Sequence, residues 1–279
     1  MTYKTERIYI LVKTYPTISK EYAELVCTAG ILETGEWIRL YPIPFRKLDV
    51  EQHYPKYSWM TVDVERNKRD FRPETFRPDI STIKVEPKPK KTDWTLRRKI
   101  ILGNTGVFTS LEKLTDRSQR EYRSLAIFKP SKILDFKCEK VEREWPKDTL
   151  TILKGLSQQQ NFFQTPEEIA KEFKVVKKVP YRFSYKFEDD VGLPATLMIE
   201  DWEIGMLYFN CLKKADNCEE IALGKVREKY FDAFTKADLY FFLGTTKQFH
   251  YVASNPYIIV GVFYPPHLPN EQQMSFFDI

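Results

Sequence analysis

Glu-Thr-Gly-Glu-Trp-Ile-Arg-Leu-Tyr, at residues 33–41, joins two apolar segments of the chain. Gly35 lies among polar residues and predicts a tight turn between two strands. Side chains alternate along the strand that follows, so Ile38 and Leu40 share one face while Arg39 lies between two aromatic residues on the other. These residues predict a β-hairpin with an arginine on its less apolar face.

Strand patterns continue on both sides of this hairpin. The predicted strands of the first 160 residues are 8–12, 23–32, 37–41, 59–65, 124–128 and 133–138, and the predicted helices are 47–53, 94–101 and 111–123. Many short strands with a few inserted helices favour a curled or barrel-like sheet.

The chain changes character after a polar stretch at residues 154–161. Thr165, followed by a proline, then predicts the start of a helix. Beyond it we predict strands at 180–187, 195–199, 239–246 and 257–264, with helices at 201–214 and 218–235. This order favours an antiparallel sheet with one helical face. We therefore predict an α+β protein with a β-rich half at 1–160, an α+β half at 161–264 and an extended tail at 265–279.

Composition excludes several classes of protein. In a chain of 279 residues, 42% hydrophobic and 15% aromatic residues supply ample material for a packed core, which excludes global disorder. The formal net charge of +5 is too small for a histone-like polyelectrolyte. The 4 cysteines form no C-x-x-C pair and there are only 3 histidines, so we expect no structural metal site.

The amino-terminal residues run directly into a predicted strand without the apolar core of a signal peptide. No apolar run approaches the roughly 20 residues that a membrane-spanning helix needs. We expect a cytoplasmic protein with reduced cysteines and no membrane partner.

The end of the chain contains a short motif after a proline-rich spacer at 265–271. The motif consists of Gln273, Met274, Ser275, Phe276 and Phe277. It resembles the peptide with which bacterial proteins bind the replication sliding clamp, Gln-Leu-Ser/Asp-Leu-Phe, with methionine and phenylalanine in the places of the two leucines. The resemblance covers five residues and implies a clamp as partner. The alternative is a tail that folds back on its own domain.

Two basic segments suggest contact with DNA. Residues 69–78 interleave arginines with phenylalanines, a mixture that suits phosphate contact and base stacking. Residues 84–99 are rich in lysine and arginine and suit a loop and helix that follow a phosphate backbone. The predicted nucleic-acid-binding residues are Arg39, Arg46, Arg72, Arg77, Lys90, Lys91, Arg97, Arg98 and Lys99. The same residues are also expected where the aliphatic parts of arginine side chains cover aromatic rings on a surface that binds no ligand.

The densest acidic cluster, Glu200-Asp201-Trp202-Glu203, lies at a predicted junction between a strand and a helix. Asp201 and Glu203 could hold a magnesium ion for phosphodiester hydrolysis, and they are the candidate catalytic residues. The structural reading is that Asp201 caps the helix and Glu203 favours its first turn. His250, in a predicted loop, is a candidate acid or base, although a lone histidine in a loop is more often solvated, as we expect here.

Three hypotheses follow. The first is a DNA-associated bacterial protein tethered to the sliding clamp, in DNA maintenance or in defence against foreign DNA, with no cofactor. The second is a magnesium-dependent nuclease or DNA-modifying enzyme centred on Asp201 and Glu203. The third is an interaction protein without a nucleic-acid partner, whose tail completes its own fold.

Overall fold

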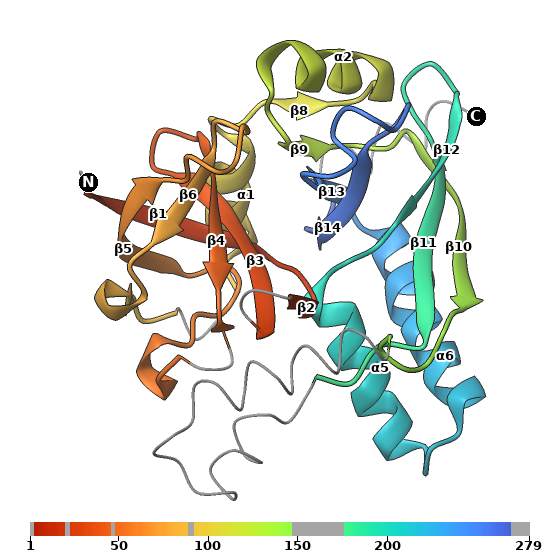
Figure 1. The fold of residues 1–279 in the computed structure, drawn as a ribbon. Coiled ribbons are helices and arrows are strands. Elements are labelled where there is room, and N and C mark those ends of the chain that lie inside the picture. Colours follow the sequence, from red (N-terminus) through yellow and green to blue (C-terminus); the bar gives the residue numbers. More distant parts are fainter. Residues whose placement is uncertain (1–2, 20–22, 46–47, 89–91, 147–175, 269–279) are drawn as a thin grey trace, which may run out of the picture.

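The computed structural model describes residues 3–19, 23–45, 48–88, 92–146 and 176–268 (Figure 1). Its fold class is α+β, as predicted. The first half is a β-barrel, and the second half combines helices with two antiparallel-rich sheets. In the described part of the chain, no helix has both the length and the apolar character needed to cross a membrane.

The barrel is a closed ring of five strands. In spatial order these are β1 (Lys4–Lys13), β3 (Ala23–Leu32), β4 (Trp37–Ile43), β6 (Thr75–Pro78) and β5 (Trp59–Arg66), and β5 pairs back with β1. The short strands β2 (Thr17–Ser19) and β7 (Lys84–Val85) extend it at β3 and β5. The predicted hairpin is confirmed as β3 and β4, with Gly35 at a φ of 85° in the turn. Closure requires β1 and β3 to approach closely at Gly30, where an added Cβ would lie 2.2 Å from the Tyr9 carbonyl oxygen.

The second half contains two sheets. One has the order β10 (Lys132–Lys140), β11 (Tyr181–Glu188) and β12 (Pro194–Met198), and the other has the order β14 (Tyr257–Phe263), β13 (Tyr240–Thr245), β9 (Leu125–Phe128) and β8 (Val107–Phe108). The helices are α1 (Trp94–Leu102), which follows the barrel, and α2 (Leu111–Glu121), α5 (Trp202–Lys214) and α6 (Glu219–Arg227). A π-helical turn, η4 (Glu228–Ala233), and a 3-10 turn, η5 (Phe234–Lys236), continue α6.

Several sequence predictions need correction. The predicted strands at 124–128 and 133–138 exist as β9 and β10, but they pair with β13 and β11 and not with the barrel. The four strands expected in one sheet are divided between two sheets, which an isolated parallel bridge connects between Ile199, just after β12, and Ile259 of β14. Of the predicted helix at 47–53, the described residues show only a 3-10 turn, η2 (Val50–Gln52).

Strand pairing also divides the chain earlier than residue 160. Residues 107–140 supply β8, β9 and β10, and all three belong to sheets of the second half. The polar boundary stretch and the predicted helix start at Thr165 lie outside the described residues.

The two halves share a hydrophobic core. Tyr9, Leu11 and Trp37 of the barrel pack against Phe242 and Phe263 of the second half. Trp37 meets Phe242 edge to face, with ring centroids 6.0 Å apart. The strand face of β4 that was predicted to be less apolar is therefore buried against the second half.

Candidate nucleic-acid interface

Three exposed aromatic rings from separate segments meet at the surface. Phe71 lies in the loop between β5 and β6, Tyr122 follows α2, and Tyr251 lies between β13 and β14. Their exposed fractions are 38%, 49% and 48%. The ring centroids of Phe71 and Tyr251 are 5.0 Å apart, and those of Tyr122 and Tyr251 are 5.9 Å apart. We call these three residues the aromatic platform.

The backbone of Tyr122 is held in an unfavourable conformation. Its φ of 61° and ψ of 9° place it in the left-handed region, where it ends α2. Glycine or asparagine normally occupies this position because a Cβ atom there crowds the backbone. A bulky ring kept exposed at a position that favours glycine points to a function for the ring.

Each segment that supplies a ring also supplies a cation. Arg69 precedes Phe71 by two residues, Arg123 follows Tyr122, and Lys247 precedes Tyr251 by four. Lys247 joins two of these segments, since its ammonium group donates to the Arg69 carbonyl oxygen over 2.6 Å. Arg123 lies 3.6 Å from the exposed Glu121. Each segment of the aromatic platform therefore carries a cationic residue close to its ring in the sequence.

A buried polar network connects the segments beneath the aromatic platform. The guanidinium of Arg72 donates to both oxygens of Asp70 and, over 2.6 Å, to the Thr245 carbonyl oxygen. Burial raises the pKa of Asp70, but the hydrogen bonds and charge of Arg72 outweigh it and hold the pKa below its usual value. The hydrogen bond from Arg72 to Thr245 fixes the loop before β6 to the end of β13.

His250 extends the network and is fully buried, contrary to the prediction of a solvated side chain. Its Nε2 lies 3.0 Å from the Ser118 carbonyl oxygen, and its Nδ1 lies 2.6 Å from the Thr245 hydroxyl oxygen. A carbonyl only accepts, so Nε2 holds the proton and Nδ1 accepts from the hydroxyl. The neutral ring joins α2 to the loop of Tyr251.

Acid is expected to loosen this network. Burial lowers the pKa of His250 below its ordinary 6.5. The unfolded chain therefore takes up a proton before the folded one does, and stability falls as the pH drops below about 6.5. A plot of unfolding free energy against pH, from urea titrations between about pH 5 and 7.5, should slope less in His250→Asn than in the wild type. Equal slopes would contradict the role of a neutral His250.

A second buried network involves Arg39. This guanidinium donates to the Ser124 hydroxyl over 2.6 Å, and the Ser124 backbone N–H and hydroxyl both donate to the Glu74 carboxylate. The network anchors the chain immediately after Tyr122. Arg39 and Arg72 are 3% and 6% exposed, so neither side chain reaches a phosphate. Both have structural roles and do not belong to the nucleic-acid-binding surface in which they were predicted.

The other predicted basic residues are distributed differently. On α1, Arg97 covers the rings of Tyr57 and Trp94, Arg98 forms an ion pair with the buried Asp238 at 2.7 Å, and Lys99 is exposed. Arg77 is half-buried on β6. The predicted residues that lie outside the described part are Arg46, Lys90, Lys91, Gln273, Met274, Ser275, Phe276 and Phe277.

The candidate catalytic carboxylates are engaged with a lysine. The Lys56 ammonium group lies 3.2 Å from Oδ2 of Asp201 and 3.0 Å from Oε2 of Glu203. Asp201 is completely buried and caps α5, where it accepts from the Glu203 backbone N–H. Burial raises the pKa of Asp201, whereas for Glu203 the nearby Lys56 outweighs burial and lowers it. Within the described ranges, no three histidine, cysteine or acidic side chains are grouped to hold a metal ion.

Comparison with known protein families divides the chain where its strands do. Residues 4–103 match a family described as Domain of unknown function (DUF8758), and residues 107–279 match Domain of unknown function (DUF8757). The second match spans more than half of the chain. The chain belongs to the DUF8757 family. No curated protein matches it.

Sequence reasoning for this DUF8757 member found one ring of the aromatic platform and missed two. Phe71 lies in the segment at residues 69–78, whose arginines and phenylalanines predict contact with DNA. Tyr122 and Tyr251 stand beside Arg123 and His250 with no repeating pattern. The available signal was a tyrosine at the expected end of a helix, next to a cation.

Proposed function

We propose that this protein binds nucleic acid and that unpaired bases stack on the aromatic platform. The observation that supports it is the meeting of three half-exposed rings with a cation from each of their segments. Single-stranded nucleic acid is bound by this combination, since every base offers a π-face and every phosphate a negative charge. Stacking of one base contributes about 1–3 kcal/mol.

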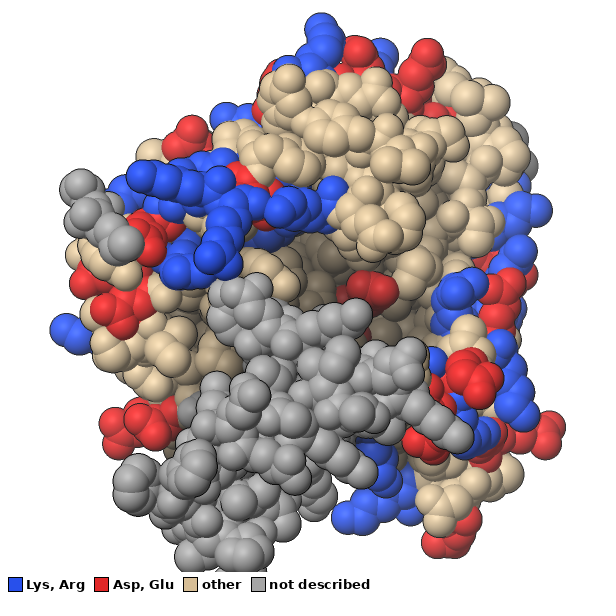
Figure 2. Space-filling model, viewed as in Figure 1, with Lys and Arg blue, Asp and Glu red and all other residues tan. Residues whose placement is uncertain are grey.

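The distribution of charge on one face of the molecule supports the same proposal. Figure 2 shows Lys and Arg side chains gathered over the barrel side of the molecule, above a hollow between the two halves. A strand of phosphates that crosses such a surface releases bound counterions, so its binding weakens as salt rises. A purely structural surface of aromatic rings would show no such dependence.

Fluorescence anisotropy of labelled oligonucleotides tests the proposal. We expect saturable binding of a single-stranded 20-mer at micromolar protein or below, tighter than binding of the matched duplex, with affinity that falls as salt is raised. A basic surface without stacking would prefer the duplex, because its charge density is higher. The absence of saturable binding to either would overturn the proposal.

Tethering to a bacterial sliding clamp remains part of this proposal through residues 273–277. A large apolar side chain that enters a pocket contributes about 1.5–3 kcal/mol, so three such side chains support micromolar affinity after the ordering cost. Tethering would raise the local concentration of a weak DNA binder next to replicating DNA. A role in DNA maintenance or in defence against foreign DNA would suit such a tether.

A labelled peptide of residues 270–279 should bind a bacterial clamp in a fluorescence titration, and Phe276→Ala and Phe277→Ala should each weaken it at least about tenfold. If instead removal of residues 272–279 lowers the melting temperature and the peptide stays unbound, the tail completes its own fold and the tether is refuted.

The nuclease alternative receives no support from the placement of its residues. Asp201 has no exposed surface, and the side chains of Asp201 and Glu203 both contact the ammonium group of Lys56. A buried lysine between two carboxylates forms a structural ion pair between the halves of the molecule.

A further inference from the structure

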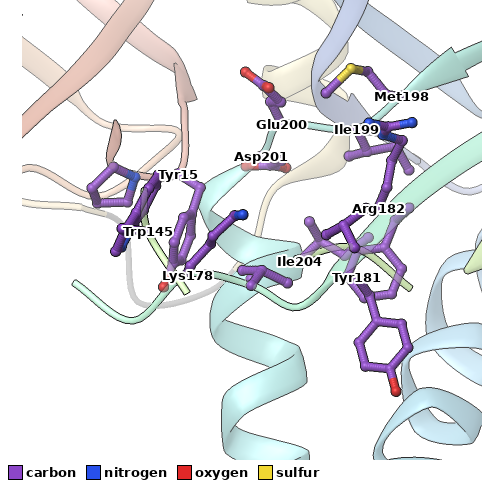
Figure 3. Close-up of a pocket in the computed structure, with 15 residues that line it drawn as sticks. Tyr15, Trp145, Lys178, Tyr181, Arg182, Met198, Ile199, Glu200, Asp201 and Ile204 are labelled. Carbon is purple, nitrogen blue, oxygen red and sulfur yellow. The ribbon is translucent and has the colours of Figure 1, made fainter. Parts of the chain in front are cut away.

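A cavity of about 310 Å³ lies where the segment after β1 approaches the start of α5 and the strands β11 and β12. This volume lies at the lower end of the range for small-ligand sites, about 300–1,000 Å³. Tyr15, Trp145 and Lys178 line one side of it and Tyr181 and Arg182 the other, with Glu200 at one end (Figure 3). Apart from Asp201, the other lining residues are apolar.

Two flat rings of this cavity are fixed with their polar atoms already engaged. The Trp145 indole N–H donates to the Val176 carbonyl oxygen over 2.8 Å, and the Tyr15 hydroxyl donates to the Lys177 carbonyl oxygen over 2.7 Å. Tyr15 also presses against α5 at Gly205, where an added Cβ would lie 2.4 Å from the Tyr15 Cδ2 atom. The polar atoms of both rings are therefore engaged, and recognition of a ligand by hydrogen bonds is left to other groups.

Glu200 is the carboxylate available for that recognition. Among the residues that the structure describes, its side chain has no hydrogen-bond or ion-pair partner, whereas the neighbouring Asp201 is held by Lys56. Burial raises the pKa of Glu200 and the charge of Arg182 opposes this rise. A half-buried carboxylate without a partner bears a desolvation cost that a ligand with N–H donors would offset.

The cations at the rim are placed for an anionic group. Lys178 lies 5.9 Å from the Trp145 ring centroid and donates to the Glu144 carbonyl oxygen. Arg182 is half-exposed and lies 4.0 Å from Glu139, a distance at the outer limit of an ion pair. Both keep donors for a phosphate.

We propose that this cavity binds a single nucleotide through its base, and that it prefers guanine. The aromatic faces of Tyr15 and Trp145 suit a flat ring, and an ionised carboxylate accepts hydrogen bonds and donates none. Guanine presents two adjacent donors, N1–H and N2–H, to both oxygens of Glu200. Adenine and cytosine each place a ring-nitrogen acceptor beside a single amino group, and thymine places carbonyls on both sides of its one N–H, so all three meet the carboxylate less well.

This inference rests on the proposed function in one respect: it takes the nucleotide to be part of a bound nucleic-acid strand. A strand bound to the protein could place an unstacked base in the cavity, as proteins that read a base outside the helix do. The aromatic platform would then hold the strand and the cavity would read one base.

Isothermal titration calorimetry with free 5′-monophosphates of the four deoxynucleosides tests the cavity without a strand. We expect dGMP to bind at least about tenfold more tightly than dTMP, and Glu200→Gln to remove this preference, since its amide replaces one acceptor with a donor. Gly205→Ala should weaken all nucleotides alike by displacing Tyr15. Tyr3→Ala, at an exposed ring before β1, should leave nucleotide binding unchanged.

No saturable heat with any nucleotide at millimolar concentration, or an unchanged preference in folded Glu200→Gln, would overturn the inference. A preference for a pyrimidine would do the same. Oligonucleotide binding is measured separately. If the protein binds a strand but the cavity binds no nucleotide, the inference about the cavity is refuted and the proposed function is not.

Discussion

Replacing Lys56 with methionine is expected to lower the free energy of unfolding by about 3–5 kcal/mol. The change leaves the carboxylate of Asp201, which has no exposed surface, without its cation. Lys13 cannot replace it, because its ammonium group donates to the Tyr54 carbonyl oxygen over 3.1 Å and lies 4.4 Å from the Phe45 ring centroid. Urea denaturation at pH 7 measures the loss.

A second substitution should restore most of this stability. Asparagine at position 201 still caps α5 but has no charge, so Lys56→Met combined with Asp201→Asn should be more stable than Lys56→Met alone. Glu203→Gln should cost less than Lys56→Met, because the Glu203 side chain is 46% exposed and water solvates it. If the double variant is no more stable than the single one, the loss comes from packing and the ion pair is not its cause.

The Lys56→Met variant should also respond to acid in a distinctive way. Its buried, unpaired Asp201 has a pKa raised by burial, so its folded state takes up a proton before its unfolded state does. Stability of the variant should therefore rise, relative to the wild type, as the pH falls from 7 toward about 5. This comparison uses the same urea titrations.

Replacing Tyr122 with glycine is expected to change binding and stability in opposite directions. Loss of the ring should lower the affinity for a single-stranded oligonucleotide about 5- to 150-fold, which corresponds to about 1–3 kcal/mol of stacking. Glycine at the left-handed position removes backbone crowding and should leave stability unchanged or raise it by up to about 1 kcal/mol. Anisotropy titrations and urea denaturation measure the two effects.

Tyr3 provides the matched control for this prediction. It is 45% exposed, close to the exposure of Tyr122, and it lies on the barrel before β1. Tyr3→Ala should leave the affinity for the oligonucleotide unchanged. Equal affinities of Tyr122→Gly and the wild type would show that the ring of Tyr122 does not stack on a base.

Local patterns predicted the elements well and their partners poorly. The hairpin around Gly35, the helix that Asp201 caps and the antiparallel pair of β13 and β14 all follow from residues adjacent in sequence. The pairing of β9 with β13 joins residues more than a hundred positions apart, and no local pattern specifies it. The expected barrel is real, but the sequence could not show which strands close it.

The candidate site was likewise predictable only in part, for a different reason. A charged residue is expected at the surface, yet Arg39 and Arg72 are buried because Glu74, Asp70 and backbone carbonyls surround them. Those partners include Ser124 and Thr245 from the second half, so tertiary structure decides the burial. The aromatic platform likewise forms from three loops that only the folded chain brings together.

The measurement that tests the central claim most directly is photo-cross-linking of a single-stranded oligonucleotide that contains 5-iodouracil, followed by mass spectrometry of the peptides. We predict adducts on peptides with Phe71, Tyr122 and Tyr251, and their loss when excess unlabelled oligonucleotide competes. Adducts confined to other parts of the protein, with all three of these peptides unmodified, would contradict the proposal that bases stack on the aromatic platform.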